Sequence, residues 1–520
     1  MATTVSIGQK VQSLNPATGE VLAEFDPASE AGVGVAVARA HDASPAWQHC
    51  GIGERARYLL ALRDVLYQRR NEVAALITRE AGKPTLESLV FEVMVVLDNL
   101  EYFARFGEKF LAPQRVPHHN LAVKFKRGRL LYEPYGVIGI ISPSNYPFLI
   151  PFVQMIPALI GGNTVVFKPS EFTPQIGLAF RELCEAAGFP SGVLNVVVGD
   201  GTTGRALVDS AIDKLIFTGS VPTGKRIQAA AAERLLPTVL ELGGKDPMIV
   251  CEDADLDVAS SAAVWGAFTN AGQACLSVER LYAARAVAER FTQLCVDKAK
   301  QLRVGPPDDP ATDIGPLIRP RQVAIVEDHV EDAVAKGAQV LTGGHRPELP
   351  GFFYEPTVLQ GVNHTMRIMC QETFGPVLPI MVADSDEEAV ALANDSEFGL
   401  SATVWTRDSA RGERLARRLQ AGAVMVNDCI SYIGVCEAPH GGVKASGIGR
   451  THSRLGLQEV VRVKYVDVDL VPQLPKLWWF KYGAQAKKMM DGFVDLLFAP
   501  SLARRVLGGL KMIVNISRKL

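Results

Sequence analysis

Short runs of apolar residues, each followed by a more polar stretch, recur along the middle of the chain. From residue 136 to residue 251 the runs GVIGIIS, NTVVFKPS, LNVVVGD, KLIFTGS and DPMIVC are rich in β-branched and apolar residues, and most are separated by segments of helical character. Continuous apolar strands that alternate with helices are typical of a parallel sheet covered on both faces. The pattern therefore predicts a doubly wound α/β domain.

A second set of such runs follows after about residue 245, where RLYAAR, QVLTGG, PVLPIMVA, SATVWT and AVMVND stand. Their recurrence predicts a second α/β domain. Ahead of both sets, an apolar stripe at helical spacing predicts a helix over 54–81, ended at Gly82, and a second helix over 86–107. The Asn-Pro and Thr-Gly turns within 14–25 predict a hairpin.

Two further stretches, 127–134 and 460–470, have the character of strands, and the second alternates at period two. Their positions in the chain predict that they leave the main sheets, and we expect them to pair between subunits.

Composition and charge narrow the classes of function. The chain has 520 residues, 48% of them hydrophobic, and a net charge of −2, which gives no indication of nucleic-acid binding. Its eight cysteines are placed singly, with no C-x-x-C and no zinc-ligand spacing, so we expect free thiols in a reducing compartment and no metal site. We find no secretory signal pattern and no run of 18 apolar residues, which favours a cytoplasmic location.

Several loops carry candidate chemistry, and each has a plainer interpretation when taken alone. Cys275, in AGQACLSVER, is either a buried structural cysteine or a nucleophile. Glu241, before the Gly-Gly turn of ELGGKDP, is either a surface carboxylate or a general base. Lys168 and Glu171, in FKPSE after a strand, are either solvated or placed to bind ribose hydroxyls.

The loop FTGSVPTGKRI follows an apolar strand and precedes a helical segment. It is either a tight turn or a phosphate loop at a helix N-terminus. It lacks the G-x-G-x-x-G spacing of the common dinucleotide fingerprint.

Taken in order, seven motifs resemble the aldehyde dehydrogenase superfamily over roughly residues 10–470: EPYGVIGIISPSNYPF, VVFKPSEFTP, FTGSVPTGKRI, ELGGKDP, GQACLSVER, QETFGPVLPI and HGGVKASGIGR. Cys275 follows Glu241 by 34 residues, a spacing typical of that family. The resemblance implies an α/β fold with a doubly wound NAD-binding domain, a second α/β catalytic domain and a small β oligomerisation element, in a homodimer or homotetramer. The corresponding boundaries are 1–116 with 136–244 for the NAD-binding domain, 245–445 for the catalytic domain, 117–135 with 446–472 for the bridging strands, and 473–520 for an extension.

The resemblance also implies roles for three catalytic residues. Cys275 matches the family's nucleophile, which adds to an aldehyde carbonyl and later carries a thioester. Asn145 matches the side-chain donor to the oxyanion, and the backbone N–H of Cys275 is the other donor. Glu241 matches the base that activates water, which favours a free acid over an acyl-CoA product.

Alternatives to this reading stay open. One is a CoA-acylating or reductive semialdehyde dehydrogenase that uses the same cysteine. Another is a non-catalytic, membrane-associated scaffold that kept the fold. Leu276 beside the nucleophile suggests an apolar aldehyde as the substrate.

For the cofactor, the resemblance implies NAD and leaves NADP open. Lys168 and Glu171 match positions that hold the adenosine ribose, and a carboxylate there repels a 2′-phosphate. Glu372 and Phe374 match the pair that positions the nicotinamide ribose and ring. The remaining cofactor residues implied in this way are Ile141, Ser142, Pro143, Ser144, Ser170, Gly201, Phe217, Gly219, Ser220, Gly224 and Leu242.

Some residues near these motifs receive a plainer interpretation. Ser144 stands where the family has an aromatic residue, so we expect a smaller wall at the cofactor site. His440 is expected to be structural, because the reaction needs no histidine. Cys184, Cys251 and Cys295 are expected in the core, whereas Cys429 and Cys436 are left open because their stretch often lines the substrate tunnel in this family.

The C-terminal stretch 473–520 differs from the rest by its charge. It holds nine lysine and arginine residues and two aspartates. Its composition predicts either a basic amphipathic segment that contacts an anionic membrane surface or a helical cap on a subunit. The aromatic residues are Trp478, Trp479 and Phe480, the predicted apolar face is Leu502, Val506, Leu510 and Ile513, and the basic residues singled out are Lys476, Lys481, Arg504, Arg505, Lys511, Arg518 and Lys519.

Overall fold

The computed structural model describes residues 10–473, 476, 478–480 and 482–516. The chain forms two compact units, one of Met1–Leu111 with Glu133–Arg462 and the other of Ala112–Tyr132 with Val463–Leu520. Lys481, Arg518 and Lys519, which the sequence singles out for their charge, lie outside the described residues.

The N-terminal part of the larger unit confirms the predicted hairpin and helices. Strands β1 (Val11–Leu14) and β2 (Val21–Phe25) pair antiparallel. Helix α2 (Ile52–Ala81) ends at Gly82, whose φ of 73° is a left-handed conformation that favours glycine. The helix expected over 86–107 is instead built of three pieces. The helical segments of this part are α1 (Glu30–His49), α2, α3 (Thr85–Glu87), a π-helix (Ser88–Met94) and α4 (Val95–Leu111).

The first set of apolar runs forms a six-stranded sheet of order β17-β9-β8-β5-β6-β7, in which β5 to β9 are parallel. Every residue of β5, β6 and β8 is buried, which explains the continuous apolar runs. The strands are β5 (Val137–Ile141), β6 (Thr164–Lys168), β7 (Leu194–Val196), β8 (Lys214–Thr218), β9 (Thr238–Glu241) and β17 (Gly447–Ile448), and the helices that connect or cover them are α5 (Leu149–Ile160), α6 (Pro174–Ala186), α7 (Gly201–Asp209), α8 (Val221–Glu233) and α15 (Ser453–Glu459).

The second set of runs forms a seven-stranded sheet of order β12-β13-β14-β11-β10-β15-β16, parallel except at β12. A large buried cluster of apolar side chains packs around this sheet. Its strands are β10 (Asp246–Val250), β11 (Val278–Ala284), β12 (Gln339–Thr342), β13 (Thr357–Gln360), β14 (Val377–Ala383), β15 (Ser401–Trp405) and β16 (Ala423–Val426), with helices α9 (Leu256–Phe268), α10 (Ala288–Ala299), α11 (Pro320–Ala335), α12 (Arg367–Cys370), α13 (Asp386–Asn394) and α14 (Ser409–Ala416).

The smaller unit contains a sheet of order β18-β4-β3, with β3 (Gln114–Val116), β4 (Lys126–Pro134) and β18 (Val461–Asp469). The strands expected over 127–134 and 460–470 are thus present outside the two main sheets, next to each other within one chain. The stretch 446–472, expected to bridge, is divided: β17 pairs with β9 of the six-stranded sheet, and β18 joins β4.

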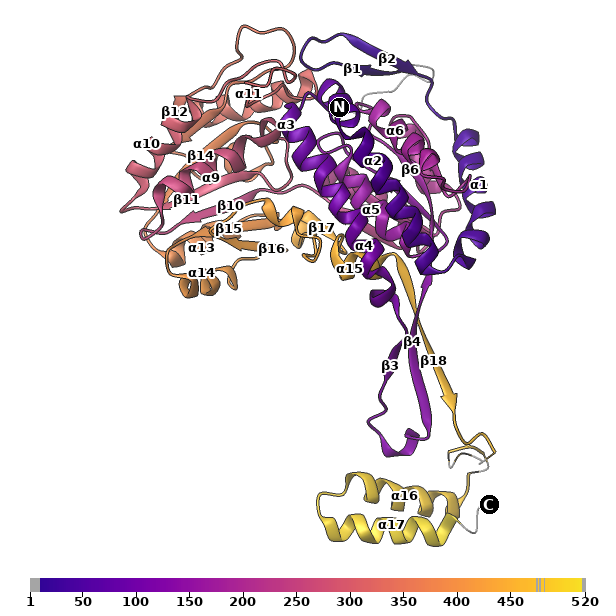
Figure 1. The fold of residues 1–520 in the computed structure, drawn as a ribbon. Helices are drawn as coiled ribbons and strands as arrows, with labels where there is room; N and C mark the ends of the chain where they lie inside the picture. The colour runs from indigo at the N-terminus through magenta and orange to yellow at the C-terminus, as the bar shows by residue number, and fades with distance from the viewer. Residues whose placement is uncertain (1–9, 474–475, 477, 481, 517–520) are drawn as a thin grey trace. The chain divides into compact units, whose positions relative to one another are not determined.

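Two helices close the described chain, α16 (Ala484–Phe498) and α17 (Leu502–Ile516), which lie side by side (Figure 1). Glycines allow their close approach, because a Cβ at Gly508 would lie 2.6 Å from the backbone nitrogen of Leu496 and one at Gly492 would lie 2.7 Å from the Gly508 carbonyl oxygen. In the described part of the chain, no helix is both long and apolar enough to cross a bilayer.

Candidate active site

Cys275 lies on a tight loop between α9 and β11. A short turn, Thr269–Gly272, precedes it, and Asn270 and Ala271 both adopt left-handed conformations there, with φ of 51° and 54°. Gly272 packs so closely that a Cβ at this position would overlap the Gly375 carbonyl. Packing therefore requires a glycine at position 272.

A half-buried carboxylate holds this turn. Glu87 accepts hydrogen bonds from Thr269 Oγ1 at 2.7 Å and from the Asn270 backbone N–H at 2.9 Å. The Asn270 side chain in turn donates to the Asn145 carbonyl oxygen at 2.9 Å, and Asn145 Nδ2 donates to the Gln273 carbonyl oxygen at 3.0 Å. A side-chain amide carries two N–H groups, so Asn145 retains one for a ligand while it is tied to the nucleophile loop.

A second buried network fixes the loop that carries Asn145. The Lys83 ammonium pairs with Glu92 at 2.5 Å and lies 3.6 Å from the centre of the Tyr146 ring. Glu92 also accepts from the backbone N–H groups of Phe148 and Leu149 at 3.0 and 2.8 Å. The sequence did not indicate the structural roles of Lys83, Glu87 and Glu92. Charged side chains in or next to a predicted helix normally indicate solvent exposure.

Two cavities meet at the nucleophile. A cleft of about 1070 Å³ lies on one side, and an apolar cavity of about 220 Å³ lies on the other. Four residues line both: Ile150, Thr218, Glu241 and Cys275. The predicted nucleophile and the predicted base thus lie where the two cavities join.

The cleft gathers the predicted cofactor residues at the carboxyl ends of the parallel strands of the first sheet. Asn145 also lines it. Gly224 is not among the lining residues; a Cβ there would meet the Leu242 side chain at 2.6 Å, so this glycine serves helix–strand packing. The predicted residues that do line the cleft are Ile141, Ser142, Pro143, Ser144, Lys168, Ser170, Glu171, Gly201, Phe217, Gly219, Ser220, Leu242, Glu372 and Phe374.

The residues of this cleft fit a dinucleotide. Lys168 and Glu171 stand 3.4 Å apart at the end of β6. Ser220 precedes α8 without capping it through its side chain, which leaves the first N–H groups of a 13-residue helix for a phosphate. Glu372 accepts from the Gly244 N–H at 2.9 Å, and burial raises its pKa to about 8. A Cβ at Gly243 would lie 2.5 Å from Glu372 Oε2, so glycine at this position lets the carboxylate approach the backbone closely.

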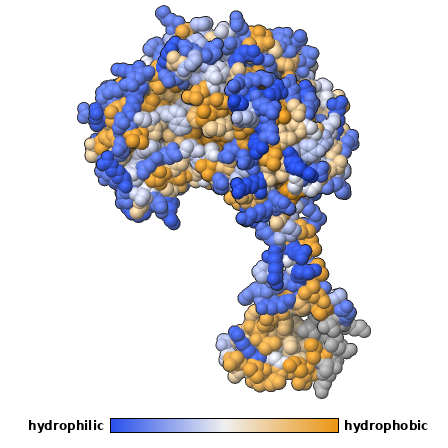
Figure 2. Space-filling model, viewed as in Figure 1, coloured by the Kyte–Doolittle hydropathy of each residue, from blue (hydrophilic) through white to orange (hydrophobic). Residues whose placement is uncertain are grey.

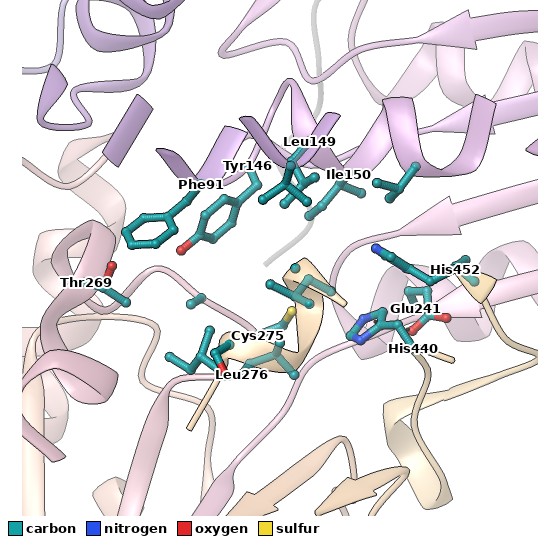
Figure 3. A pocket seen from close by; sticks show the side chains of 18 of the residues that line it. Phe91, Tyr146, Leu149, Ile150, Glu241, Thr269, Cys275, Leu276, His440 and His452 are labelled. Carbon is teal, nitrogen blue, oxygen red and sulfur yellow. Dashed lines mark hydrogen bonds and ion pairs between the residues drawn. The ribbon is translucent and has the colours of Figure 1, made fainter. Parts of the chain in front are cut away.

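Apolar side chains form most of the second cavity (Figure 3). The π-helix, α5, α9 and the loop 430–434 supply its walls, and Leu276 lines it as well. Glu241, His440 and His452 gather on one side, and Cys275 lies between them and the aromatic rings of Phe91 and Tyr146 (Figure 3). The apolar lining residues are Val90, Phe91, Met94, Val95, Leu149, Ile150, Val153, Trp265, Ala274, Leu276, Ile430 and Ile433.

Burial governs the charge of both catalytic candidates. It raises the pKa of the Cys275 thiol, and the nearby carboxylates of Asp246, Glu372 and Glu241 raise it further. Burial also raises the pKa of Glu241 well above its usual range, against the opposing charge of Arg450. Among the described residues, neither Glu241 oxygen has a hydrogen-bond partner. Without a ligand, the site therefore favours a neutral thiol and a neutral carboxyl group.

The other singled-out residues lie as follows. Cys184, Cys251 and Cys295 are buried, as expected for core residues. Cys429 and Cys436 are buried as well, next to Ile430 and Gly434, which line the apolar cavity. The structure places His440 beside Glu241, a proximity that the sequence did not indicate. Among the described residues no group of histidine, cysteine and carboxylate side chains could hold a metal ion.

Residues 4–466 match the model of the aldehyde dehydrogenase family. The chain belongs to the aldehyde dehydrogenase family. It is 36% identical to a 4,4'-diapolycopene aldehyde oxidase of Methylomonas sp over 94% of this chain and 91% of the relative. It is 39% identical to a betaine aldehyde dehydrogenase of Cereibacter sphaeroides over 89% and 95% of the two chains.

Solved structures of this family share the fold. One, an NAD+ complex of an aldehyde dehydrogenase from Bacillus cereus, matches with a TM-score of 0.86 and 36% identity, covering 89% of this chain and 94% of that one. The resemblance inferred from seven sequence motifs is confirmed, and so is the α/β fold. The chain is an NAD(P)-dependent aldehyde dehydrogenase.

Proposed function

We propose that this aldehyde dehydrogenase oxidises apolar aldehydes to free carboxylic acids with NAD, through a thioester on Cys275. One observation carries the proposal: Cys275 lies where an apolar cavity opens into a cleft that fits a dinucleotide. An aldehyde group that enters through the apolar cavity would lie next to both Cys275 Sγ and the cofactor cleft.

The residues at this junction have complementary roles. The Cys275 thiol loses its proton to water, and the thiolate Sγ attacks the carbonyl carbon. The remaining Asn145 N–H and the Cys275 backbone N–H bind the resulting oxyanion. NAD, when bound in the cleft, supplies the hydride acceptor. Glu241 then takes a proton from the water that adds to the thioester; the carbon–sulfur bond breaks and the acid leaves.

The lining of the substrate cavity supports an apolar substrate. Its charged or titratable side chains are Glu241, His440, His452, Tyr146 and Cys275, all beside the reaction centre, and its described lining holds no lysine or arginine. A carboxylate-bearing aldehyde would enter without a cation to pair with, which is unfavourable in an apolar site. The relative named as a diapolycopene aldehyde oxidase acts, by its name, on a large apolar aldehyde.

Glu171 supports NAD rather than NADP. Its carboxylate lines the cleft beside Lys168 and would hydrogen-bond ribose hydroxyls while repelling a 2′-phosphate. Glu241, buried and close to the nucleophile, supports hydrolysis over acyl transfer to CoA.

The test of this function is NADH formation with straight-chain aldehydes of increasing length, benzaldehyde and succinic semialdehyde, with and without CoA. We expect CoA-independent turnover that rises with chain length and is weak with succinic semialdehyde. Each buried methylene contributes about 0.8 kcal/mol, or roughly fourfold in kcat/KM, until the cavity is filled. A requirement for CoA would refute the hydrolytic role of Glu241. If no NADH forms under any of these conditions, the non-catalytic scaffold is favoured.

We further propose that the α16–α17 hairpin contacts an anionic membrane surface. Figure 2 shows apolar residues gathered over these helices. The described basic side chains of the segment, such as Lys488, Arg504 and Lys511, would pair with lipid phosphates. The exposed apolar residues are Val494, Phe498, Leu502, Val506, Leu507, Leu510, Ile513 and Val514.

Vesicle co-sedimentation of the full chain tests this contact. We expect binding to phosphatidylglycerol-containing vesicles, weaker binding to pure phosphatidylcholine, and loss of binding in Val506→Glu/Ile513→Glu. Val334→Glu, on an exposed apolar position of α11, is the matched control and should bind like wild type. A double variant that binds vesicles normally but changes its oligomeric state would show a subunit cap instead.

We also infer a homodimer or homotetramer. β18 is an edge strand of its sheet and exposes Val463, Tyr465 and Val468, which favours pairing with another copy. Light scattering coupled to size exclusion should give a mass of two or four chains, and Val463→Lys/Val468→Lys should shift it towards one.

A further inference from the structure

A histidine faces the proposed base at the polar end of the apolar cavity. His440 Nε2 lies 3.5 Å from Glu241 Oε2, and His440 Nδ1 lies 2.8 Å from the Tyr432 hydroxyl. Both members of the close pair are buried, with His440 7% exposed and Glu241 3%. Glu241 ends β9, whereas Tyr432 and His440 lie in the segment between β16 and β17, so the fold brings two distant segments together.

Each member of this pair, considered singly, is held neutral by its surroundings. Burial raises the pKa of Glu241, and the Arg450 charge and the Thr451 hydroxyl oppose this rise only in part. Burial lowers the pKa of His440 to about 4, and the nearby Arg450 charge lowers it further. A lone buried carboxylate is a costly charge, so Glu241 needs a partner before it can act as a base.

His440 lies close enough to Glu241 to be that partner. If the Glu241 proton moves to His440 Nε2, two neutral groups become a carboxylate–imidazolium pair with no net charge, separated by an ion-pair distance. Attraction within the pair offsets part of the desolvation of each charge. The imidazolium Nδ1–H can then donate to the Tyr432 oxygen, which fixes the ring.

We propose that His440, oriented by Tyr432, accepts the proton of Glu241 and so increases the ionised fraction of Glu241 during hydrolysis of the thioester. This inference rests on the proposed function, in which Glu241 is the base. His440 is a positioning residue, because it acts through Glu241 rather than on the acyl group.

The step conserves atoms and charge. Water oxygen bonds to the acyl carbon, the carbon–sulfur bond breaks, and its electron pair stays on Cys275 as a thiolate. Glu241 receives the proton lost by water, while His440 keeps the proton it took from Glu241. The thiolate and imidazolium charges balance until one proton returns to sulfur or leaves to solvent.

Other charged and titratable groups face this pair and determine the pH range over which Glu241 and His440 exchange the proton. Arg450 favours the ionised form of Glu241 but opposes a charged His440, and Glu459 opposes ionisation of Glu241. The His452 ring lies 5.6 Å from the His440 ring, centre to centre. The groups that act on Glu241, His440 or Tyr432 are Cys275, Asp246, Arg450, His452 and Glu459.

An ester assay separates this role from a purely structural one. A p-nitrophenyl ester of a short fatty acid acylates Cys275 without cofactor; the initial burst of p-nitrophenolate reports acylation, and the slower steady rate reports hydrolysis. Both rates are measured from mildly acidic to alkaline pH. The variants are His440→Phe, His440→Gln and Tyr432→Phe, with His364→Gln as the control, because His364 lines neither of the two cavities.

For His440→Phe we expect an intact burst and a hydrolysis rate at neutral pH that falls by about ten- to a hundredfold, part of the 10²–10⁴ that a positioned base supplies. The rate should recover at alkaline pH, because Glu241 alone ionises only above its raised pKa. His440→Gln, which keeps a donor but cannot hold the proton, should shift the profile in the same direction and carries the test if His440→Phe does not fold.

Tyr432→Phe should produce a smaller shift of the same sign, and His364→Gln should leave the pH midpoint in place. An unchanged profile in both His440 variants would overturn the inference. Equal losses of burst and hydrolysis at every pH would overturn it too, since they indicate a structural role. A normal hydrolysis rate in Glu241→Gln would instead refute the base assigned in the proposed function.

Discussion

The two cavities that meet at Cys275 differ in how they are built. The cofactor cleft is made largely of loops that follow parallel strands, and it presents polar and titratable groups such as Lys168, Glu171 and Glu372. The apolar cavity is made of helix faces and a loop from distant parts of the chain, and apolar side chains form most of its lining. The cleft can select its ligand by directed polar contacts, whereas the apolar cavity can select only by the shape and size of an apolar ligand.

Replacing the sulfur of Cys275 should abolish the chemical step while leaving cofactor binding unchanged. Cys275→Ala is expected to reduce aldehyde oxidation by at least about 10³-fold, because no other group can form the thioester. NAD affinity, measured by quenching of intrinsic fluorescence, should change little, since the cleft keeps its charged residues. Retained turnover in this variant would contradict the account.

Asn145 lies on the cofactor side but should act on the aldehyde oxygen. Asn145→Ala removes one of two oxyanion donors and is expected to lower kcat by about 10²–10³-fold. The KM for NAD should stay within a small factor of wild type. A change confined to KM would mean that Asn145 binds cofactor rather than the oxyanion.

A cation placed in the apolar cavity should shift the substrate preference of the enzyme from long apolar aldehydes towards aldehydes that carry a carboxylate. Met94 lines the cavity from the π-helix and is 53% exposed, so Met94→Arg can be accommodated without a buried unpaired charge. We expect kcat/KM for long aldehydes to fall about tenfold, as some apolar contact worth roughly 1–2 kcal/mol is lost. Succinic semialdehyde should gain, and the ratio of the two kcat/KM values is the measurement. Met94→Leu, which stays apolar, is the control.

The smallest expected effect concerns the choice of cofactor. Glu171→Ser removes a partly exposed carboxylate, whose repulsion of a 2′-phosphate we place at about 1 kcal/mol. The ratio of kcat/KM with NADP to that with NAD should rise roughly fivefold, and high salt should reduce the difference between wild type and variant. An unchanged ratio would remove Glu171 from cofactor selection.

The same contrast explains what the sequence could predict. Cys275, Glu241 and the Lys168–Glu171 pair lie in contiguous motifs at the ends of apolar strands, so their neighbourhood could be inferred from local pattern. The π-helix (Ser88–Met94) left no signal, because its residues fit the ordinary helical periodicity of 86–107. Its effect is to present Phe91 and Met94 to the cavity.

Buried polar contacts between distant segments were also beyond prediction. Glu87 contacts a turn 182 residues further along the chain, and Lys83 pairs with Glu92 under the Tyr146 ring. His440 reaches Glu241 only once β17 has joined the first sheet beside β9. In a sequence these residues look like surface or structural positions, since their partners are set by tertiary packing.

The central claim is that Cys275 carries the acyl group of an apolar aldehyde at the junction of the two cavities. Intact-protein mass spectrometry of Glu241→Gln, mixed with NAD and hexanal and quenched in acid, tests it directly, because slowed hydrolysis should let the thioester accumulate. We predict one added hexanoyl group, mapped to the peptide that contains Cys275 and absent from Glu241→Gln/Cys275→Ala. An adduct on Cys429 or Cys436, or NADH formation with no adduct at all, would contradict the account.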